Sequence, residues 1–593
     1  MSFNKAQFLI EQDDLQKIID VDDSAGRSVP INMNFIQEGY LTKDTGFELF
    51  GIVEDTLCHS LFHFKKKDGT SYILRGKGTK LQSYNHKRVF TAVNATDVMT
   101  SVAHGMADTT EVYVSSTATL PTGLSANTSY FVRDATADTF KLSATSGGSA
   151  IDITTDGTGT LYIWRVAPAW EDLSPTFTEG AEFAFVAYND ELWLCNGVEN
   201  YQKWDGMVFT EYASAPKGNI MEVFEDRMFV AGVSAEPLTT YYSNVGAPQT
   251  FDPADLIKPL GTDVITNMKN YYGTLMLFKA DSIWKITFIY DQVAAAFVPK
   301  LESQSGTYGA CSRKAVVWVE NDLWFFTGRE VRAIGFVDRQ IGVFGINPSV
   351  ISEPIKETLQ TLAVADFSKV VSFYHNRRYY LGLPLLSETV NVVFVCHTLY
   401  KNSWTKYTER DKSSVNDFMV IDDVVYSTKN IVDNYGVIKW TDDLNDISSA
   451  ISSEVFFRRL EDKEFTRFRT YRYLDLLFKD LEGVVSGTIR SEGSDIASEK
   501  VKSFSIGNIL ENEENTLGEV DFGESLFADA YGQEGLVSPF VKRRVSFLSK
   551  NQAILIGLSN NSLDETFTIC KFNLVGFENT KKQMSSRKII SFS

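Results

Sequence analysis

The sequence has only six histidines and five cysteines, and their most compact group is Cys58, His59 and His63. A thiol and two imidazoles are ligands that zinc accepts. The aromatic and aliphatic residues around them favour a β-strand. On a strand, positions 59 and 63 share a face but lie about 13 Å apart, which is too far for both to bind one ion. We therefore predict a structural role for these residues and no metal site.

Paired carboxylates, which could act as a general acid and base, occur at Asp422-Asp423 and Asp442-Asp443, with the similar pair Asn189-Asp190. Each pair stands where a turn is expected, because Asp and Asn hydrogen-bond their own backbone in turns. The sequence has no phosphate-binding glycine loop, no nucleophile elbow and no paired-histidine zinc motif. We predict no catalytic residue and no bound cofactor.

Two basic clusters are candidates for contacts with a partner. Lys65, Lys66 and Lys67 precede the predicted Asp68-Gly69 turn, where they could meet an acidic partner or a DNA backbone. The second cluster is expected to form salt bridges between subunits and consists of Arg458, Arg459, Arg467, Arg469 and Arg472. The alternative for both clusters is a solvated surface.

Composition limits the class of protein. The 593 residues predict three or four domains, and 44% apolar with 22% charged residues is typical of a soluble globular protein. The net charge of −19 repels nucleic acid, which excludes a protein that grips DNA but not one that DNA slides past. The five cysteines are scattered, so we expect reduced, buried thiols and assembly in a cytoplasm. The polar, acidic start is unlike a secretory signal, and the sequence contains no apolar stretch long enough to span a membrane as a helix.

A short phrase recurs six times: an apolar segment, a tight polar turn and a second apolar segment rich in aromatic residues. Its copies cover residues 185–194, 221–230, 268–278, 316–326, 371–381 and 418–426. Each copy predicts a β-hairpin, and their spacing of roughly 35 to 55 residues is typical of four-stranded propeller blades. The predicted fold is therefore all-β, with a propeller of about six to eight blades.

The phrase also divides the chain into domains. We assign residues 51–89 and 160–440 to the propeller, with Tyr162-Ile-Trp164 as its resumption, and residues 90–159, rich in Thr, Ser, Ala and Gly, to an inserted small β-domain. A strand series over 441–593 predicts a C-terminal β-sandwich with a tail. Residues 1–50 form an N-terminal arm with the first strands, and apolar spacing over 6–19 favours a short amphipathic helix.

Several phrases resemble the tail nozzle proteins of short-tailed bacteriophages, also called tail tubular protein B or packaged-DNA stabilisation protein. The phrases that carry this resemblance are, in chain order, Asp68-Gly69, Gly78-Thr-Lys-Leu81, Arg227-Met-Phe-Val-Ala-Gly232, Tyr241-Tyr-Ser-Asn-Val-Gly-Ala-Pro248, Leu277-Phe-Lys-Ala-Asp-Ser-Ile-Trp284, Gly309-Ala-Cys-Ser-Arg-Lys-Ala-Val316 and Asn402-Ser-Trp404. The insert resembles a small β module of phage structural proteins, called FCCH-like, through Leu120-Pro-Thr-Gly-Leu124 and Thr139-Phe-Lys-Leu142.

The resemblance implies a virion protein that forms a hexameric ring below the portal and adaptor proteins. Such a ring retains the packaged genome, conducts the double-stranded DNA during ejection without sequence-specific binding, and contacts tail fibres, spikes or a needle. The resemblance brings no catalytic residue with it. It also implies assembly in the host cytoplasm and a final place in the phage tail.

Other functions fit the same fold, because a propeller does not determine its function. A tail-tip propeller that recognises a host surface glycan would show several aromatic side chains exposed on one face. A propeller glycosidase or lyase would bring two acids together from different blades. A Kelch-like adaptor is a third alternative.

Overall fold

The computed structural model describes most of residues 7–578; residues 1–6, 13–28, 493–499, 508–539 and 579–593, together with short stretches inside other loops, lie outside the described part. The described chain is almost entirely β-structure. Its described helices are one short α-helix, α1 (Lys356–Leu359), and two 3-10 helices, η3 (Glu353–Ile355) and η4 (Val364–Lys369).

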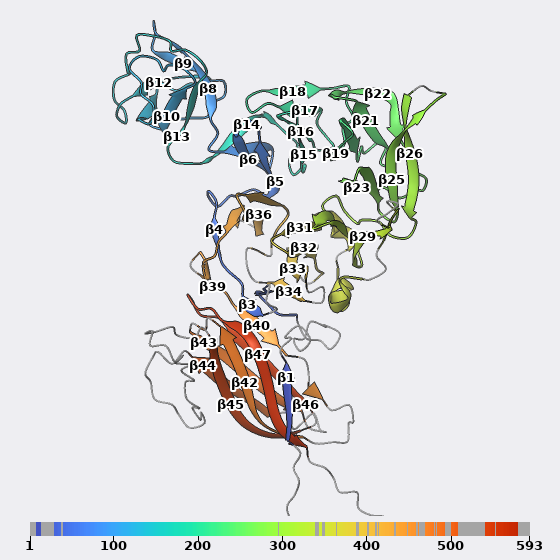
Figure 1. Ribbon diagram of the computed structural model, residues 1–593. Coiled ribbons are helices and arrows are strands. Elements are labelled where there is room, and N and C mark those ends of the chain that lie inside the picture. The colour runs from blue at the N-terminus through green and yellow to red at the C-terminus, as the bar shows by residue number, and fades with distance from the viewer. Residues whose placement is uncertain are drawn as a thin grey trace, which may run out of the picture.

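Seven antiparallel sheets follow one another along the chain and form a seven-bladed propeller (Figure 1). The strands of blades 1 to 3, from first to last, are β5 (Cys58–Lys65), β6 (Ser71–Lys77), β7 (Lys80–Tyr84) and β14 (Trp170–Thr176); β15 (Ala184–Tyr188), β16 (Glu191–Cys195), β17 (Tyr201–Trp204) and β18 (Phe209–Tyr212); β19 (Ile220–Phe224), β20 (Arg227–Ala231), β21 (Thr240–Asn244) and β22 (Ala247–Ile257).

The strands of blades 4 to 6 are β23 (Ile265–Tyr271), β24 (Thr274–Lys279), β25 (Ile283–Asp291) and β26 (Ala296–Ser305); β27 (Val316–Val319), β28 (Asp322–Phe326), β29 (Val331–Asp338) and β30 (Val343–Ile346); β31 (Val371–His375), β32 (Arg378–Pro384), β33 (Asn391–His397) and β34 (Trp404–Tyr407). Blade 7 contains β35 (Phe418–Ile421), β36 (Val424–Ile431), β37 (Asn434–Trp440), β4 (Phe47–Leu49) and the short β38 (Asn445–Asp446) and β39 (Ser449–Ala450).

Blade 7 closes the ring with a strand from the other end of the chain. Its fourth strand is β4, which pairs antiparallel with β37 through Leu49 with Ile438 and Phe47 with Trp440. The first strand of blade 7 lies against β5 of blade 1. Seven hydrophobic clusters, one for each pair of neighbouring blades, fill the spaces between the sheets. Burial between blades therefore holds the wheel together.

The six repeated phrases form the first hairpin of blades 2 to 7, as predicted. The turns of all but blade 5 have the two positive φ angles of type I′ hairpins, for example 54° and 60° at Asn189 and Asp190 and 48° and 66° at Asp422 and Asp423. These carboxylates are turn residues, as the sequence indicated. Since all six turns join the first strand of a blade to its second, they lie on one face of the propeller.

The insert is a closed six-stranded barrel between β7 and β14 of blade 1. Its strands are β8 (Arg88–Val93), β9 (Val98–Thr100), β10 (Glu111–Ser116), β11 (Ser129–Arg133), β12 (Thr139–Ser143) and β13 (Leu161–Arg165). The predicted limits of 90–159 were wrong, because Tyr162-Ile-Trp164 belongs to β13, which pairs with β8 and β10 and not with a blade. The barrel has a hydrophobic core of its own.

Both strands that connect the barrel to blade 1 are anchored on one carboxylate. Glu171 of β14 forms ion pairs with Arg88 at 3.1 Å and with Arg165 at 3.5 Å. Its side chain is 5% exposed, so this clamp is shielded from solvent. Burial raises the pKa of Glu171 against the opposing effect of the two arginines. The clamp fixes the direction in which the barrel leaves the propeller.

The last part of the chain is a two-sheet sandwich that also takes in the N-terminal strands. One sheet contains β1 (Gln7–Gln12), β2 (Met33–Phe35), β3 (Leu41–Lys43), β42 (Arg469–Lys479), β45 (Phe540–Asn551) and β47 (Thr568–Glu578). The other contains β40 (Ser453–Phe456), β41 (Leu460–Glu461), β43 (Val484–Glu492), β44 (Lys500–Gly507) and β46 (Ala553–Asn560). One hydrophobic core joins residues of both sheets.

Three predictions about the ends of the domains need correction. The helix expected within residues 6–19 is, in its described part, strand β1, because the edge of β47 offers it six backbone partners. The arm predicted at residues 1–50 is divided between the sandwich, which takes β1 to β3, and blade 7, which takes β4. The sheet of blade 7 continues to Ala450, beyond the predicted boundary at 440, because β38 pairs with β4.

A buried polar network joins the sandwich to the propeller beside the segment between β3 and β4. Lys412 Nζ lies 3.1 Å from Asp44 Oδ2 and donates to the carbonyl of Thr45 at 2.6 Å. The Lys412 and Asp44 side chains are 1% and 4% exposed. Tyr407 of blade 6 donates its hydroxyl hydrogen to Asp44 at 3.1 Å. A buried ion pair of this kind fixes geometry strongly, since either charge alone is costly to bury.

Candidate functional site

A cluster of four ion-paired side chains, Glu182, Arg313, Lys314 and Asp417, lies at the axis of the propeller. Its centre is the dipeptide Arg313-Lys314, which directly precedes the first strand of blade 5. Arg313 forms an ion pair with Glu182 of blade 2 at 2.5 Å and donates to the carbonyl of Asn219 of blade 3 at 3.0 Å. Its own carbonyl accepts a hydrogen bond from the Asn267 side chain of blade 4.

Lys314 reaches the remaining blades. Its Nζ donates to the carbonyls of His59 in blade 1 at 3.1 Å and of Asn416 in blade 7 at 2.9 Å, and its carbonyl accepts from the backbone N–H of Ser372 in blade 6 at 2.8 Å. Only a position on the axis allows one dipeptide to bond with all six other blades. Arg313 and Lys314 therefore occupy the axis at this end of the wheel.

Two acids share Lys314. Its Nζ lies 3.3 Å from Glu182 Oε2 and 3.3 Å from Asp417 Oδ2. Burial acts against the charged form of Glu182, but Lys314 and Arg313 outweigh it and lower its pKa. Asp417 also accepts backbone hydrogen bonds from Leu61 and Phe418, both at 3.0 Å. These contacts hold the acids in an ion-paired network.

The pair of acids from different blades that a propeller hydrolase would need is thus present, but it does not enclose a substrate site. A glycosidase keeps its two carboxyl groups apart so that a sugar and a water fit between them. Here an ammonium group lies within 3.3 Å of both carboxylates. The arrangement neutralises charge and joins blades. No local pattern in the sequence indicates this network, because its four residues precede the first strands of three different blades.

Two of the buried histidines, His59 and His86, belong to the packing of blade 1. His59 donates or accepts at Ser60 Oγ at 3.0 Å, and burial lowers its pKa to about 4. His86 packs beside the rings of Tyr72 and Trp204, each 5.8 Å away between ring centroids, and burial lowers its pKa to about 3. Each histidine is therefore neutral in the folded protein at pH 7.

These pKa values predict that the protein loses stability in acid. In the unfolded chain a histidine has a pKa near 6.5, so below that pH the unfolded state binds the extra proton and is favoured. Each of the two histidines should lower the free energy of unfolding by about 1.4 kcal/mol per pH unit between about pH 6 and its folded pKa.

The measurement is urea unfolding at pH 7 and pH 5 for the wild type and for His86→Phe. The variant should lose less stability between the two pH values than the wild type does. An equal loss in both proteins would show that His86 does not stay neutral on folding.

The basic residues predicted at an interface separate into two places. Lys65 ends β5, and Lys66 and Lys67 begin the turn to β6. Lys66 donates to the carbonyl of Asp205, and the backbone N–H of Lys67 donates to Asp190 Oδ1 at 2.9 Å. These two residues attach blade 1 to blade 2, and Lys65 is exposed.

Of the arginine cluster, Arg469 and Arg472 lie on β42, in the middle of the first sandwich sheet. Arg458, Arg459 and Arg467 lie outside the described residues. The predicted intersubunit salt bridges therefore stay a prediction.

Cys58, His59 and His63, for which the sequence predicted a structural role, are residues of β5, the first strand of blade 1. Within the described part of the chain, no group of three or more His, Cys, Asp and Glu side chains could hold a metal ion. His59 is buried and His63 is half-buried on the same strand.

No helix in the described part is long and apolar enough to cross a membrane.

All nine tryptophans are buried or half-buried. Trp193, Trp204 and Trp404 are fully enclosed, and Trp324 lies in the cluster between blades 5 and 6. Stacking on a sugar requires an exposed ring. Eight of the nine tryptophans lie on blade strands, whereas Trp164 lies on β13 of the barrel, and none of the nine rings is exposed as a glycan platform.

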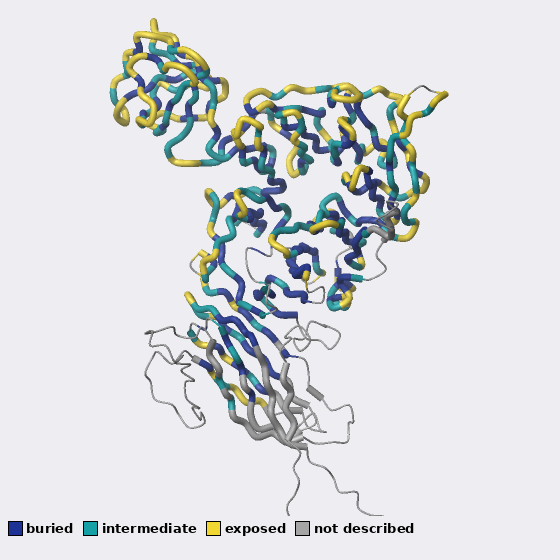
Figure 2. Tube along the Cα trace, in the orientation of Figure 1, coloured by how far each residue is buried: buried dark blue, intermediate teal, exposed yellow. Residues whose placement is uncertain are grey.

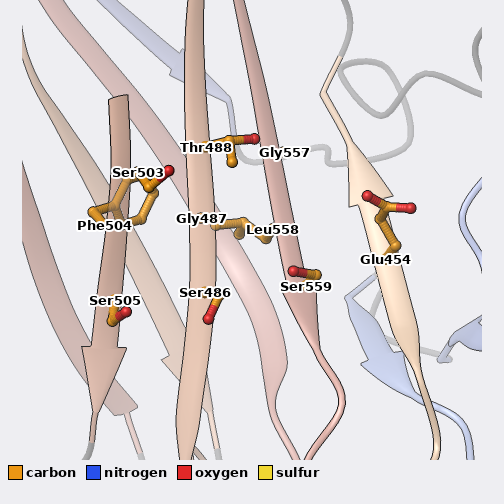
Figure 3. A pocket seen from close by; sticks show the side chains of 10 residues that line it. All are labelled: Glu454, Ser486, Gly487, Thr488, Ser503, Phe504, Ser505, Gly557, Leu558 and Ser559. Carbon is orange, nitrogen blue, oxygen red and sulfur yellow. The ribbon is translucent and has the colours of Figure 1, made fainter. Parts of the chain in front are cut away.

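A shallow hollow lies on the outer face of the second sandwich sheet (Figure 3). Its floor is a row of paired residues across four strands: Glu454, Ser559, Ser486 and Ser505. The next row contains Gly557, Thr488 and Ser503. Small hydroxyl side chains make up most of this face, and Glu454 is the one charged residue and Phe504 the one aromatic residue among those that line the hollow.

No family model and no curated protein sequence matches this chain. Among solved structures, exo-β-1,3-galactanase from Phanerochaete chrysosporium aligns with 66% of this chain and 95% of its own, at 8% identity and a TM-score of 0.22. The Pan2 WD40 domain from Neurospora crassa aligns with 60% of this chain and 89% of its own, at 10% identity and a TM-score of 0.25. The assignment as a β-propeller rests on the strand order described above.

Proposed function

We propose that this chain is a structural subunit of a bacteriophage tail. In this proposal it forms a hexameric ring, the nozzle, below the portal and adaptor proteins, retains the packaged genome and conducts the DNA during ejection. The ordered phrases from Asp68 to Trp404 that resemble tail nozzle proteins support it. The virion is then the place of action, and tail fibres, spikes or a needle are further partners.

The observation that carries the proposal is the use of the propeller axis. In binding and catalytic propellers the axis is where ligands enter, whereas here Arg313 and Lys314 use it to join all seven blades. A subunit built in this way is a scaffold. DNA would therefore pass through a lumen between subunits and not through the wheel of one subunit.

The net charge of −19 fits such a conduit, because an acidic lumen does not bind the passing duplex. The clamp at Glu171 and the ion pair at Asp44 support the same role, since they hold barrel, propeller and sandwich in fixed directions. A glycan-binding tail-tip propeller is the alternative, and the enclosed tryptophans count against it.

The test is the mass of the purified 66.5 kDa chain, alone and mixed with its candidate adaptor ring, by light scattering. A species of about six copies in either sample supports the proposal. A chain that remains single in both samples contradicts it, and binding to a glycan array would then favour the alternative.

A further inference from the structure

The hairpin β25–β26 of blade 4 extends beyond the body of the propeller (Figure 1). Near its free end Tyr290 and Phe297 stand opposite each other, with ring centroids 5.4 Å apart and planes at 71°. Their exposed fractions are 55% and 63%, and that of Val293 in the turn is 98%. Figure 2 shows exposed residues along this end of the hairpin. These are the two most exposed aromatic rings of the described residues, followed by Tyr272 at 48%.

This exposed pair continues a packing face. Along β25, Phe288 and Tyr290 point to the same side because strand residues alternate. Phe288 packs there against Phe229 and Tyr242 of blade 3. Two residues further, Tyr290 lies past the end of that contact. The end of the hairpin thus exposes the same aromatic face of β25 that, nearer the propeller, packs against blade 3.

A second apolar surface lies on the opposite side of the wheel, in the loop between β4 and β5. Ile52 and Val53 are 65% and 49% exposed there. In Figure 1 the strand β26 stands at one side of the propeller and β4 at the other. Blade 4 is the blade farthest, by strand order, from the junction of blades 7 and 1 that carries this loop.

We propose that the end of the β25–β26 hairpin of one copy packs on the Ile52–Val53 loop of a neighbouring copy. A head-to-tail contact uses two different surfaces of the same chain, and such contacts generate a closed ring when the rotation closes. This inference rests on the proposed ring and names the surface that forms it.

Charge favours an apolar contact of this kind. Copies that each carry a net charge of −19 repel one another, so polar surfaces alone would hold them poorly. The hairpin is locally balanced, because Glu302 pairs with both Lys285 and Lys300. Next to the loop, the Asp55 side chain, 91% exposed, forms an ion pair with Lys77, whose Nζ lies 3.5 Å from Asp55 Oδ1.

The size of the surface is consistent with one part of a ring contact. An aromatic side chain buries roughly 150–250 Å². Since Tyr290 and Phe297 are 55% and 63% exposed, they could bury roughly 180–300 Å² more, about a quarter to a third of the roughly 800 Å² per partner that a stable interface needs. Val245, 60% exposed in the matching turn of blade 3, extends the surface along the same rim.

Two variants test the contact. The hairpin variant is Tyr290→Ser with Phe297→Ser, and the loop variant is Ile52→Ser with Val53→Ser. The matched control is Val102→Ser, which removes an apolar side chain that is 76% exposed on the barrel. All are measured by light scattering with the adaptor present, and circular dichroism melting shows whether each variant folds.

The wild type and the control should form rings, and each double variant should fold but stay mostly monomeric. Mixing the two variants should produce dimers, because the hairpin variant keeps its loop and the loop variant keeps its hairpin. Rings that persist in either variant, or a mixture without dimers, overturn this contact but leave the ring itself standing. A wild type that never assembles overturns both the contact and the proposed function.

Discussion

Replacing Lys412 with methionine should lower the free energy of unfolding by about 3–5 kcal/mol, the usual cost of removing one partner of a buried ion pair. The substitution keeps the length of the side chain but leaves the Asp44 carboxylate, 4% exposed, without the ammonium 3.1 Å away. It also removes the bond to the Thr45 carbonyl and the cation above the Trp440 ring at 4.6 Å. The measurement is urea unfolding followed by tryptophan fluorescence.

Lys439→Met is the matched control. Lys439 pairs with Glu48 at the shorter distance of 2.6 Å, but the two side chains are 34% and 53% exposed. An exposed pair contributes about 0–1 kcal/mol. Equal effects of the two substitutions would show that burial of the Lys412–Asp44 pair does not join the propeller to the N-terminal segment.

Replacing Lys314 with methionine should destabilise the protein by about 3 kcal/mol, the lower part of the range for buried pairs, because the Lys314, Asp417 and Glu182 side chains are 15%, 19% and 32% exposed. The two carboxylates would lose the cation that they share. Arg313 would still contact Glu182 but not Asp417.

The pH dependence distinguishes this loss from a simple packing defect. Without Lys314, the neighbouring carboxylates raise each other's pKa, so protonation relieves their repulsion. The difference in the free energy of unfolding between the Lys314→Met variant and the wild type should therefore be smaller at pH 5 than at pH 8. Urea unfolding at both pH values measures it. Lys356→Met, at an exposed pair with Glu353, is the control. A difference that does not change with pH would contradict the shared role of Lys314.

The local parts of the fold could be predicted, because their signals are local. The hairpins of blades 2 to 7 combine apolar strands with Asn, Asp or Gly at positions of positive φ. The barrel limits could not be found in this way, since Tyr162-Ile-Trp164 in β13 has the same aromatic character as a blade strand. The closing strand β4 has three residues, and only its pairing with β37, about 390 positions away, identifies it.

The cluster of charged residues on the propeller axis could not be predicted from the sequence either, because it joins residues that are far apart in the chain. Glu182, Arg313, Lys314 and Asp417 are separated by more than a hundred positions, apart from the one adjacent pair, and become neighbours only when the wheel closes. A charged residue just before a strand looks like a turn residue in sequence. The exposed Tyr290 and Phe297 pair was equally hidden, because an aromatic residue on a strand is usually buried.

The measurement that tests the central claim most directly is negative-stain imaging of the purified chain, alone and together with its candidate adaptor. We predict closed rings with a central hole wide enough for duplex DNA, formed by separate propellers whose own axes are filled. Single propellers in both samples, or rings without a central hole, would contradict the proposal that this protein is a conduit for DNA.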